Sequence, residues 1–510
     1  MTDTRASRDL RHAATAPLAR RLSPKYLEEH CLLPLEIDAA GQLVVAVGGP
    51  LDPGTVDELS LLYERPLHLV DVAGDEIRAA VLSAQAGAPL DEGIADLGAA
   101  DVQVVAAEDE ALDNLRALAS QAPVIRLVNL SLLEALRHRA SDVHLECTEQ
   151  GLRVRQRIDG VLHDVTTHPR QLQAAVVSRV KIMADLNIAE RRLPQDGRVR
   201  IRLSDRELDL RVSTLPTVHG ESVVIRILDR GAGVRDLTEL GMTDTVRATF
   251  ERLVERPHGI LLVTGPTGSG KTTTLYAALQ RINRPGVKIV TVEDPVEYQL
   301  ANVTQTPVNP KAGRTFATVL RSILRHDPDV IMVGEMRDRE TSEIAIQAAL
   351  TGHLVFSTLH TNDAPGGITR LVDMGIEPYL VSATVQGLLA QRLVRLVCDD
   401  CAEPHRLGQA ERRAAEAAGV TLRGSRFRRG RGCEACAGTG YRGRNGIYEL
   451  MTMSDALRDA VVRQAPLSEI RALALAEGMV PLHRAAWEKA GAGVTTLEEV
   501  ARVTWDGAGA

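Results

Sequence analysis

Residues 265–272 carry the clearest chemistry in the sequence, because they read Gly-Pro-Thr-Gly-Ser-Gly-Lys-Thr and follow the apolar run Gly259–Val263 after the single residue Thr264. Glycines let a backbone turn tightly and aim its N–H groups at phosphate oxygens, and the dipole of the helix expected over Thr272–Arg281 adds to the attraction. We expect Lys271 to reach the β- and γ-phosphates of a nucleoside triphosphate, and Thr272 to bind its Mg²⁺. A plain glycine-rich turn would not explain Lys-Thr at the start of a helix. The residues expected to bind the nucleotide are Gly265, Pro266, Thr267, Gly268, Ser269, Gly270, Lys271 and Thr272.

Three further apolar runs each lead into an acid or an imidazole. They are Lys288–Val292 before Glu293, Val330–Val333 before Gly334 and Glu335, and Leu354–Thr358 before His360. Ligands of open α/β sheets bind at the carboxyl ends of the strands, so we expect these residues to converge on the loop after Val263. Glu335 suits the orientation of an attacking water, and Glu293 suits a metal or supporting role. A helix cap or a salt bridge is the alternative for a single acid, and convergence on one edge argues against it.

Four of the six cysteines form two pairs with the spacing of zinc ligands. The pairs are Cys398 with Cys401 and Cys433 with Cys436. A gap of two residues lets one tight turn present two thiolates to a tetrahedral Zn²⁺, and four thiolates leave no open position for catalysis. The 31 residues between the pairs exceed the usual spacing, so we expect the segment around Arg406–Arg431 to leave the metal site and return. The remaining cysteines, Cys31 and Cys147, are expected to fill cores.

Composition indicates a water-soluble protein of about three domains, with 510 residues, 44% hydrophobic residues and a net charge of −7. No window reaches the roughly 18 apolar residues of a membrane span, and the first residues lack the apolar core of a signal peptide. We therefore expect a cytosolic protein that reaches a membrane only through partners. The acidic balance also argues against nonspecific binding of nucleic acid.

Charge patterning divides the first half of the chain. Residues 84–113 carry eight acidic side chains and no Lys or Arg, which predicts a solvated linker, placed at 84–118. Before it we expect a small α/β domain over 1–83, with a strand at Gln42–Val47 and a helix at Thr55–Tyr63. The arginine-rich start of the chain is expected to be solvated, with docking on an acidic partner as the alternative.

A second domain is expected over residues 119–232. Apolar residues at helical spacing predict a helix ending near Arg139, and a second helix is expected over Gln171–Ala189. Apolar and cationic residues then alternate, as in Val199, Ile201 and their arginine neighbours, which predicts an antiparallel sheet packed on the second helix. Residues 151–230 hold 15 Lys and Arg against 10 Asp and Glu, but no aromatic residue to stack a base. We therefore expect two or three of these arginines to bind nucleotide phosphate.

The ordered motifs resemble the secretion ATPase family of the GspE/PulE/PilB type over about residues 121–450. The matching segments are Ala140–Glu146, Arg157–Gly160, Pro194–Arg198, Asp209–Ser213, the Walker A loop Gly265–Thr272, the aspartate box Thr291–Tyr298, Leu320–Asp329, the Walker B strand ending at Gly334 and Glu335, the histidine box from Thr351 to Ala364, and the four cysteines with Thr439–Arg444. The segments around Arg370–Pro378 and Ala390–Arg395 resemble type II secretion members more than pilus assembly members.

The resemblance implies an α/β fold with several parts. These are a small N-terminal docking domain, a PAS-like α+β second domain and a RecA-like P-loop NTPase motor over 233–510, with a tetracysteine zinc subdomain at 398–450 and C-terminal helices at 451–510. By position it implies Glu335 as the Walker B glutamate, Glu293 as the acid of the aspartate box and His360 as the histidine-box sensor. It further implies Arg198 and Arg211 as arginines that reach the phosphates, and Arg321 and Arg325 as subunit-interface arginines. Gly334 stands where most P-loop enzymes place a Mg²⁺-binding Asp.

The function that the resemblance implies is a hexameric ATPase that drives pseudopilus assembly and protein export in type II secretion. ATP, Mg²⁺ and Zn²⁺ are the implied cofactors. The implied partners are an inner-membrane platform and cytoplasmic adaptor proteins at the inner face of the cytoplasmic membrane, with no nucleic acid. A motor for type IV pilus assembly or DNA uptake is the alternative. A subunit that binds nucleotide without turnover is disfavoured by Glu335.

Overall fold

The computed structural model describes residues 18–80 with short gaps, 103–104, 122–203, 206–229, 233 and 235–504. It divides into two compact units, Met1–Ala100 and Asp101–Ala510. The arginine-rich start lies outside the described residues, and so does the predicted linker apart from Gln103–Val104. In the described ranges, no helix combines the length and the apolarity that crossing a membrane requires.

The first unit contains a three-stranded sheet in the order β1-β2-β3. Its strands are β1 (Leu32–Ile37), β2 (Leu43–Val47) and β3 (Leu67–Asp71). β2 pairs antiparallel with β1 and parallel with β3. The strand predicted at Gln42–Val47 is β2, and the described residues between Thr55 and Tyr63 are helical, so both predicted elements are confirmed.

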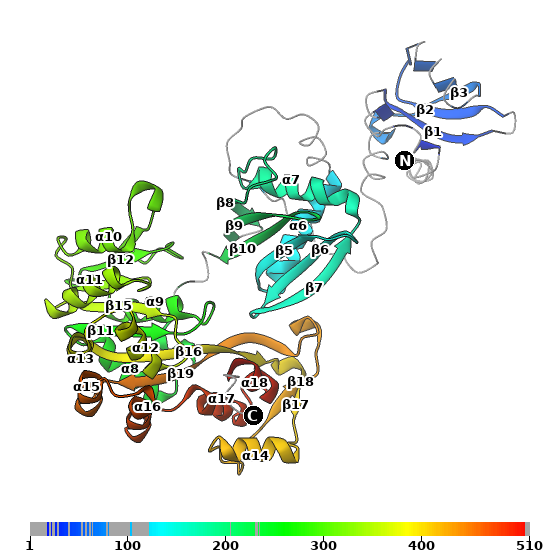
Figure 1. The fold of residues 1–510 in the computed structure, drawn as a ribbon. Coiled ribbons are helices and arrows are strands. Elements are labelled where there is room, and N and C mark those ends of the chain that lie inside the picture. The colour runs from blue at the N-terminus through cyan, green and yellow to red at the C-terminus, as the bar shows by residue number, and fades with distance from the viewer. Residues whose placement is uncertain are drawn as a thin grey trace. The chain divides into compact units, whose positions relative to one another are not determined.

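An antiparallel sheet of seven strands opens the second unit. In pairing order its strands are β4 (Gln103–Val104), β8 (Gln195–Leu203), β9 (Arg206–Thr217), β10 (Gly220–Asp229), β5 (Ala140–Cys147), β6 (Leu152–Ile158) and β7 (Val161–His168). Helices α6 (Ala122–Arg137) and α7 (Gln173–Met183) lie against each other and against this sheet (Figure 1). Val199 and Ile201 are buried while the intervening Arg200 is exposed, so the predicted alternation is confirmed.

Helix α7 is shorter than the predicted Gln171–Ala189. The residues Arg170–Leu172 form a tighter 3₁₀ turn, and α7 itself ends at Met183. Asp185 then adopts a φ of 55°, which a continuing α-helix does not allow. Apolar residues beyond the helix, such as the buried Ile188, extend the pattern without extending the helix.

A second seven-stranded sheet forms the centre of the region from Gly259 to Thr452. In pairing order its strands are β13 (Val303–Pro307), β12 (Ile289–Glu293), β14 (Val330–Val333), β15 (Leu354–Leu359), β11 (Gly259–Thr264), β16 (Val385–Val397) and β19 (Tyr441–Thr452). All neighbours pair in parallel except β16 and β19. The carboxyl ends of β11, β12, β14 and β15 therefore lie along one edge.

Helices cover both faces of this sheet, which explains its continuous apolar strands. Leu262 of β11 packs into one core with Leu320 and Ile346, while the neighbouring Leu261 packs into a second core with Phe250. The helices of this part of the chain are α8 (Asp244–Val254), α9 (Lys271–Ile282), α10 (Phe316–Ile323), α11 (Arg339–Leu350), α12 (Ala364–Asp373), α13 (Pro378–Thr384), α15 (Asp455–Val462), α16 (Leu467–Ala476), α17 (Leu482–Gly491) and α18 (Leu497–Thr504).

A buried ion pair joins helix α7 to strand β10. Lys181 of α7 lies 2.5 Å from Glu221 of β10, and the two side chains are 1% and 7% exposed. Replacing Lys181 by Met leaves a buried carboxylate without its cation. We therefore expect the free energy of local unfolding of α7 to fall by about 3–5 kcal/mol. Native-state hydrogen exchange of α7 in the full chain measures this loss. The control is Arg153→Met, which breaks the exposed Arg153–Asp164 pair and should change α7 far less. Equal effects of the two substitutions would contradict the prediction.

Candidate functional site

The loop between β11 and α9 has the geometry of a phosphate cradle. Gly265, Gly268 and Gly270 have φ values of 146°, 80° and 88°, which side chains with a Cβ rarely adopt. A Cβ on Gly265 would lie 2.4 Å from the carbonyl oxygen of Gln391, so the backbone could not pass there with a larger residue. Helix α9 begins at Lys271, and its amino-terminal N–H groups face this loop. Thr272, the expected Mg²⁺ ligand, lies in the first turn of α9.

Two polar side chains of the loop are placed where they could bind a nucleotide. Lys271 Nζ donates to the carbonyl oxygens of Gly265 at 2.7 Å and Pro266 at 3.1 Å, which holds the ammonium over the loop. Burial lowers the pKa of Lys271 to about 8, against the opposing effect of the Glu335 carboxylate. Ser269 Oγ is buried without a hydrogen-bond partner in the described part of the chain. The cradle therefore fits a bound phosphate.

Gln391 of β16 fixes the cradle from behind, a role that the sequence did not reveal. Its Nε2 donates to Ser269 O at 2.8 Å, and its Oε1 accepts from Thr274 Oγ1 at 2.7 Å. Gln391 is buried. One side chain thus ties the loop to α9 and to the sheet, and such a contact between distant residues leaves no local pattern.

Glu335 and His360 lie together at the same sheet edge. His360 Nε2 and Glu335 Oε2 are 3.3 Å apart, and Arg337 Nη2 lies 2.7 Å from Glu335 Oε1. Thr358 Oγ1 donates to Gly334 O at 2.7 Å and joins the ends of β14 and β15. The expected convergence of these two strand ends is therefore present, with the carboxylate held between an imidazole and a guanidinium group.

Glu293 ends β12 at this edge but is engaged in a buried network. Its carboxylate accepts from Thr291 Oγ1 at 2.5 Å, from Gln305 Nε2 at 3.0 Å and from the Tyr276 hydroxyl. Burial, followed by the Glu293 charge, raises the pKa of Tyr276, which therefore stays a proton donor. The Tyr276 hydroxyl also accepts from the N–H of Glu297 at 3.3 Å. Glu293 thus holds the aspartate-box loop against α9.

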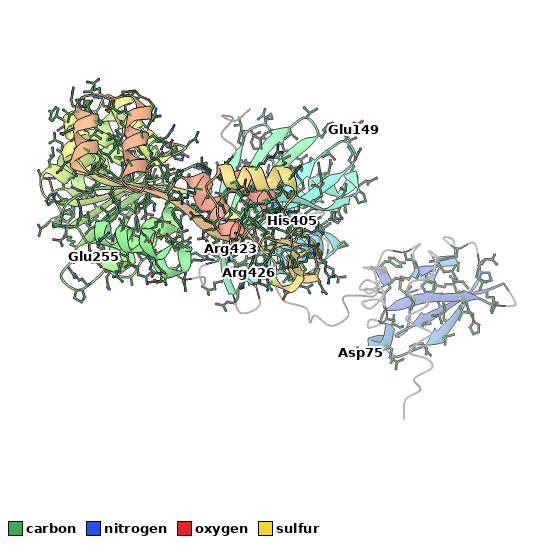
Figure 2. The ribbon with its side chains drawn as sticks, turned by 90° about the horizontal axis from the view of Figure 1, so that it is seen from below. Asp75, Glu149, Glu255, His405, Arg423 and Arg426 are labelled. Atoms are coloured by element: carbon green, nitrogen blue, oxygen red, sulfur yellow. The ribbon has the colours of Figure 1, made fainter. Side chains whose placement is uncertain are left out.

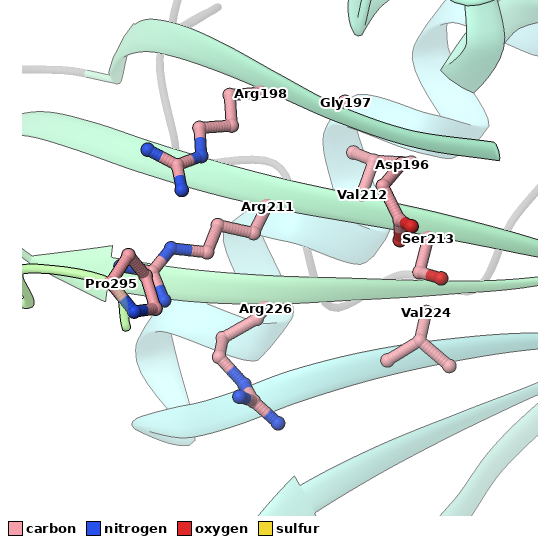
Figure 3. A pocket seen from close by; sticks show the side chains of 9 residues that line it. All are labelled: Asp196, Gly197, Arg198, Arg211, Val212, Ser213, Val224, Arg226 and Pro295. Carbon is pink, nitrogen blue, oxygen red and sulfur yellow. The ribbon is translucent and has the colours of Figure 1, made fainter. Parts of the chain in front are cut away.

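The arginines of the antiparallel sheet stand in a row across its strands. Arg198 of β8 is directly opposite Arg211 of β9, and Arg211 is opposite Arg226 of β10. They line a pocket of about 370 Å³ together with Asp196, Ser213 and Pro295 (Figure 3). Cross-strand neighbours of like charge repel one another, so such a row favours a bound anion. The resemblance implied Arg198 and Arg211 as phosphate-binding arginines, and the sequence did not single out Arg226.

Carboxylates balance two of the three arginines. Arg226 Nε donates to Asp142 Oδ1 at 2.9 Å. Arg211 Nη2 lies 3.1 Å from Glu297 Oε2 and donates to Val296 O at 3.3 Å. Arg198 has no ion-pair partner within the described ranges. Glu297, the third acid of the aspartate box, is a partner of the arginine row that the sequence reasoning missed.

The two expected interface arginines lie on the exposed side of the α10 segment. Arg321 Nη2 lies 2.7 Å from Glu340 Oε1, and Arg325 Nη1 donates to Arg321 O at 2.9 Å. These contacts run to Glu340 and the helix backbone rather than to Lys271 or Glu335. Both side chains remain accessible to a neighbouring molecule.

The four cysteines form one cluster whose size fits zinc. Their Sγ atoms all lie within 4.8 Å of one another, and three of the separations are 3.9, 3.9 and 3.7 Å. Tetrahedral Zn–S bonds of about 2.3 Å require sulfur separations of about 3.8 Å. The Cys433 and Gly440 N–H groups donate to Cys436 Sγ, as expected beside a metal-bound thiolate.

The segment between the cysteine pairs leaves the cluster and returns, as predicted. It forms β17 (Ala402–Pro404), α14 (Gln409–Ala417) and β18 (Arg428–Gly430), with β17 and β18 paired antiparallel. Figure 2 shows His405, Arg423 and Arg426 on this segment. The two short strands close the excursion beside the cysteines.

Family models match nearly the whole chain. The model described as Type II/IV secretion system protein matches residues 117–502, and the model described as MshEN domain matches residues 8–89. Among curated relatives, Type II secretion system protein E of Xanthomonas campestris is 49% identical over 96% of this chain and 86% of its own. The protein of the same name from Pseudomonas aeruginosa is 52% identical over 80% of each chain. The type IV pilus assembly ATPase PilB of Myxococcus xanthus is 45% identical over 94% of this chain and 85% of its own.

Solved structures agree with the fold. The pilus retraction motor PilT with bound ADP has a TM-score of 0.51 and 28% identity, covering 74% of this chain and 97% of its own. The ATPase DotB of Legionella pneumophila has a TM-score of 0.55 at 20% identity, covering 74% and 95%, a likeness in fold alone. The expected α/β fold with a P-loop motor is thereby confirmed. The chain belongs to the Type II/IV secretion system protein family, and its resemblance to GspE-type secretion ATPases is confirmed.

Proposed function

We propose that this chain is the motor ATPase of a type II secretion system, in which six copies couple ATP hydrolysis to pseudopilus assembly and protein export. The observation that carries the proposal is the meeting of the Lys271 loop, Glu335 and His360 at one sheet edge. The family match and the relatives named type II secretion system protein E support the secretion assignment.

The proposed reaction is hydrolysis of ATP to ADP and phosphate. The loop N–H groups and Lys271 bind the β- and γ-phosphates, and Thr272 with phosphate oxygens would hold Mg²⁺, which neutralises their charge. Glu335 orients the attacking water, and His360 holds the Glu335 carboxylate in place. Arg198 and Arg211 supply positive charge where negative charge spreads over the transferred group. Glu293 supports this arrangement through Tyr276 rather than by touching the reacting atoms.

The same family membership supports our proposals for assembly and location. Arg321 and Arg325, exposed on the α10 segment, are proposed to face the neighbouring subunit of a homo-hexamer. The proposed partners are the inner-membrane platform and cytoplasmic adaptor proteins, which hold the ring at the inner face of the membrane. The four cysteines are proposed to bind a structural Zn²⁺.

A pilus assembly motor is the second candidate, because the Myxococcus xanthus pilus assembly ATPase is 45% identical over 94% of this chain. Both motors share the chemistry, and their membrane partners differ. Affinity capture of the tagged chain from the inner-membrane fraction distinguishes them. Co-purification of a secretion platform supports the proposal, and co-purification of a pilus platform contradicts it.

Glu335→Gln tests the hydrolytic role. The amide keeps the size and the neighbours of the side chain but cannot orient water as a carboxylate does, so we expect ATP binding to persist while steady-state turnover falls about 100-fold or more. The control is Glu343→Gln on the exposed face of α11, which should leave turnover unchanged. Undiminished hydrolysis by Glu335→Gln would refute the assigned role.

The pH dependence of ATP binding tests Lys271. Its pKa of about 8 in the free site means that the ammonium loses its proton as pH rises through 8, whereas bound phosphate stabilises the charged form. ATP binding therefore takes up a proton above that pH, and the Kd should rise about fivefold from pH 8 to pH 9. Isothermal titration in buffers of different ionisation enthalpy measures both effects. Adenosine, which lacks phosphates, is the control, and a pH-independent Kd for ATP would contradict the assignment.

Metal removal tests the cysteine site. We expect a zinc chelator to raise hydrogen exchange across residues 398–436, because four thiolates without their ion no longer hold the segment. Binding of a fluorescent ATP analogue should persist, since the nucleotide loop lies in another part of the sheet. Restoring zinc should restore protection. Unchanged exchange in protein shown to be free of zinc would count against a structural metal.

A further inference from the structure

The hairpin between β6 and β7 has a two-residue turn that leaves a carboxylate at its tip. Ile158 pairs with Val161, so Asp159 and Gly160 form the loop, with φ values of 49° and 86°. Positive φ at both positions defines a type I′ turn, for which Asp-Gly is a favoured sequence. Arg157 Nη1 donates to Gly160 O at 3.0 Å and stiffens the turn. The Asp159 side chain is therefore held at the end of the arginine-bearing sheet.

This carboxylate binds the backbone of the motor region. Asp159 Oδ2 accepts from the N–H of Gly443 at 2.7 Å, and its Oδ1 lies 3.7 Å from Arg444 Nε. Although it is an aspartate at a hairpin tip, its side chain is only 13% exposed. The contact joins residues 284 positions apart, and a hydrogen bond to a charged group is stronger than one between neutral groups.

An irregularity in β19 makes the Gly443 N–H available. The pairing of β16 with β19 shifts register between Arg395 and Val397, opposite the segment from Tyr441 to Arg444. Gly443, with a φ of 86°, lies in this bulge, where the ladder leaves a residue without its usual partner. The bulge therefore offers a backbone donor to another element.

The cysteine cluster fixes the chain just before this bulge. Cys436 Sγ accepts from Gly440 N at 3.2 Å, and Cys398 N donates to Gly440 O at 3.0 Å. Arg442 Nη1 donates to Asp400, which lies between the first two cysteines, at 3.2 Å. A metal held by the four thiolates would thus set the position of the Gly443 amide.

A second residue of the hairpin faces the same region. Burial lowers the pKa of His163 of β7, and the nearby Arg395 guanidinium of β16 lowers it further. Arg395 in turn lies over the Tyr441 ring at 3.8 Å and pairs with the buried Glu499. The groups that face the Asp159 carboxylate are the Gly443 amide and the Arg444 guanidinium, and His163 lies near enough for the Asp159 charge to oppose the lowering of its pKa.

We propose that Asp159 is a positioning residue, a latch that docks the arginine-bearing sheet on the bulge of β19 beside the cysteine cluster and so sets where Arg198 and Arg211 stand during hydrolysis. A short series of contacts within the sheet links the Asp159 turn to the arginine row. Arg157, two residues before Asp159, lies 3.9 Å from Asp142, and Asp142 holds Arg226 at the end of the arginine row. The role of the row rests on the proposed function, whereas the docking contact does not.

Two substitutions at position 159 distinguish loss of the hydrogen bond to Gly443 from loss of the turn. Asn at position 159 keeps both the type I′ turn and an oxygen that can accept from Gly443, whereas Gly keeps the turn and removes the acceptor. In the full-length, zinc-loaded chain, we expect Asp159→Gly to speed hydrogen exchange across residues 441–446 about tenfold or more, and Asp159→Asn to stay within about threefold of wild type. The control Asp164→Asn alters an exposed charge on the same hairpin and should change nothing.

Steady-state kinetics test the positioning role. We expect Asp159→Gly to lower kcat for ATP with little change in KM, and Asp159→Asn to restore kcat, since the arginines act on the transition state. Unchanged exchange at residues 441–446 in Asp159→Gly would overturn the latch, and so would equal loss in Asp159→Asn. Faster exchange with unchanged kcat would overturn the positioning role. A wild-type chain without hydrolysis would instead contradict the proposed function and leave the exchange result standing.

Discussion

The parallel pairing of four strands is the constraint on which the site depends. Because β11, β12, β14 and β15 run in one direction, their carboxyl ends lie along one edge, and each must be followed by residues that leave the sheet. The strands themselves are buried on both faces and hold no exposed polar group for chemistry. The reactive side chains that this sheet contributes are therefore confined to this edge, where the glycine loop and the amino end of α9 already favour phosphate.

The arginine row has an electrostatic cost. Three guanidinium groups directly opposite one another repel, and the molecule balances Arg226 with Asp142 and Arg211 with Glu297. Arg198 keeps its charge available to a bound anion. Glu297 belongs to the loop that Glu293 and Tyr276 hold against α9, so the partner of Arg211 is positioned by the same helix that begins at Lys271. The Arg211–Glu297 ion pair, the hydrogen bond from Glu297 N–H to Tyr276 and helix α9 thus link the position of Arg211 to the glycine loop.

Local sequence was sufficient for the features that depend on a few adjacent residues. The glycine loop, the apolar strands and the cysteine spacing could be predicted because turn geometry, burial and metal ligation act over short distances. Arg226, Glu297 and Gln391 could not, because their roles arise from strand register and from contacts between distant residues. The end of α7 was also missed, since the positive φ of Asp185 interrupts an apolar pattern that continues beyond it. The buried network around Glu293 is a further case, because its donors come from three separate elements.

The most direct test of the account is a structure of the assembled protein with Mg²⁺ and a non-hydrolysable ATP analogue. We expect one nucleotide whose β- and γ-phosphates lie within hydrogen-bonding distance of the Gly265–Thr272 backbone and Lys271, with Glu335 facing the γ-phosphate and an Arg198 or Arg211 guanidinium in contact with it. A nucleotide bound elsewhere, or a γ-phosphate distant from both Glu335 and these arginines, would contradict it.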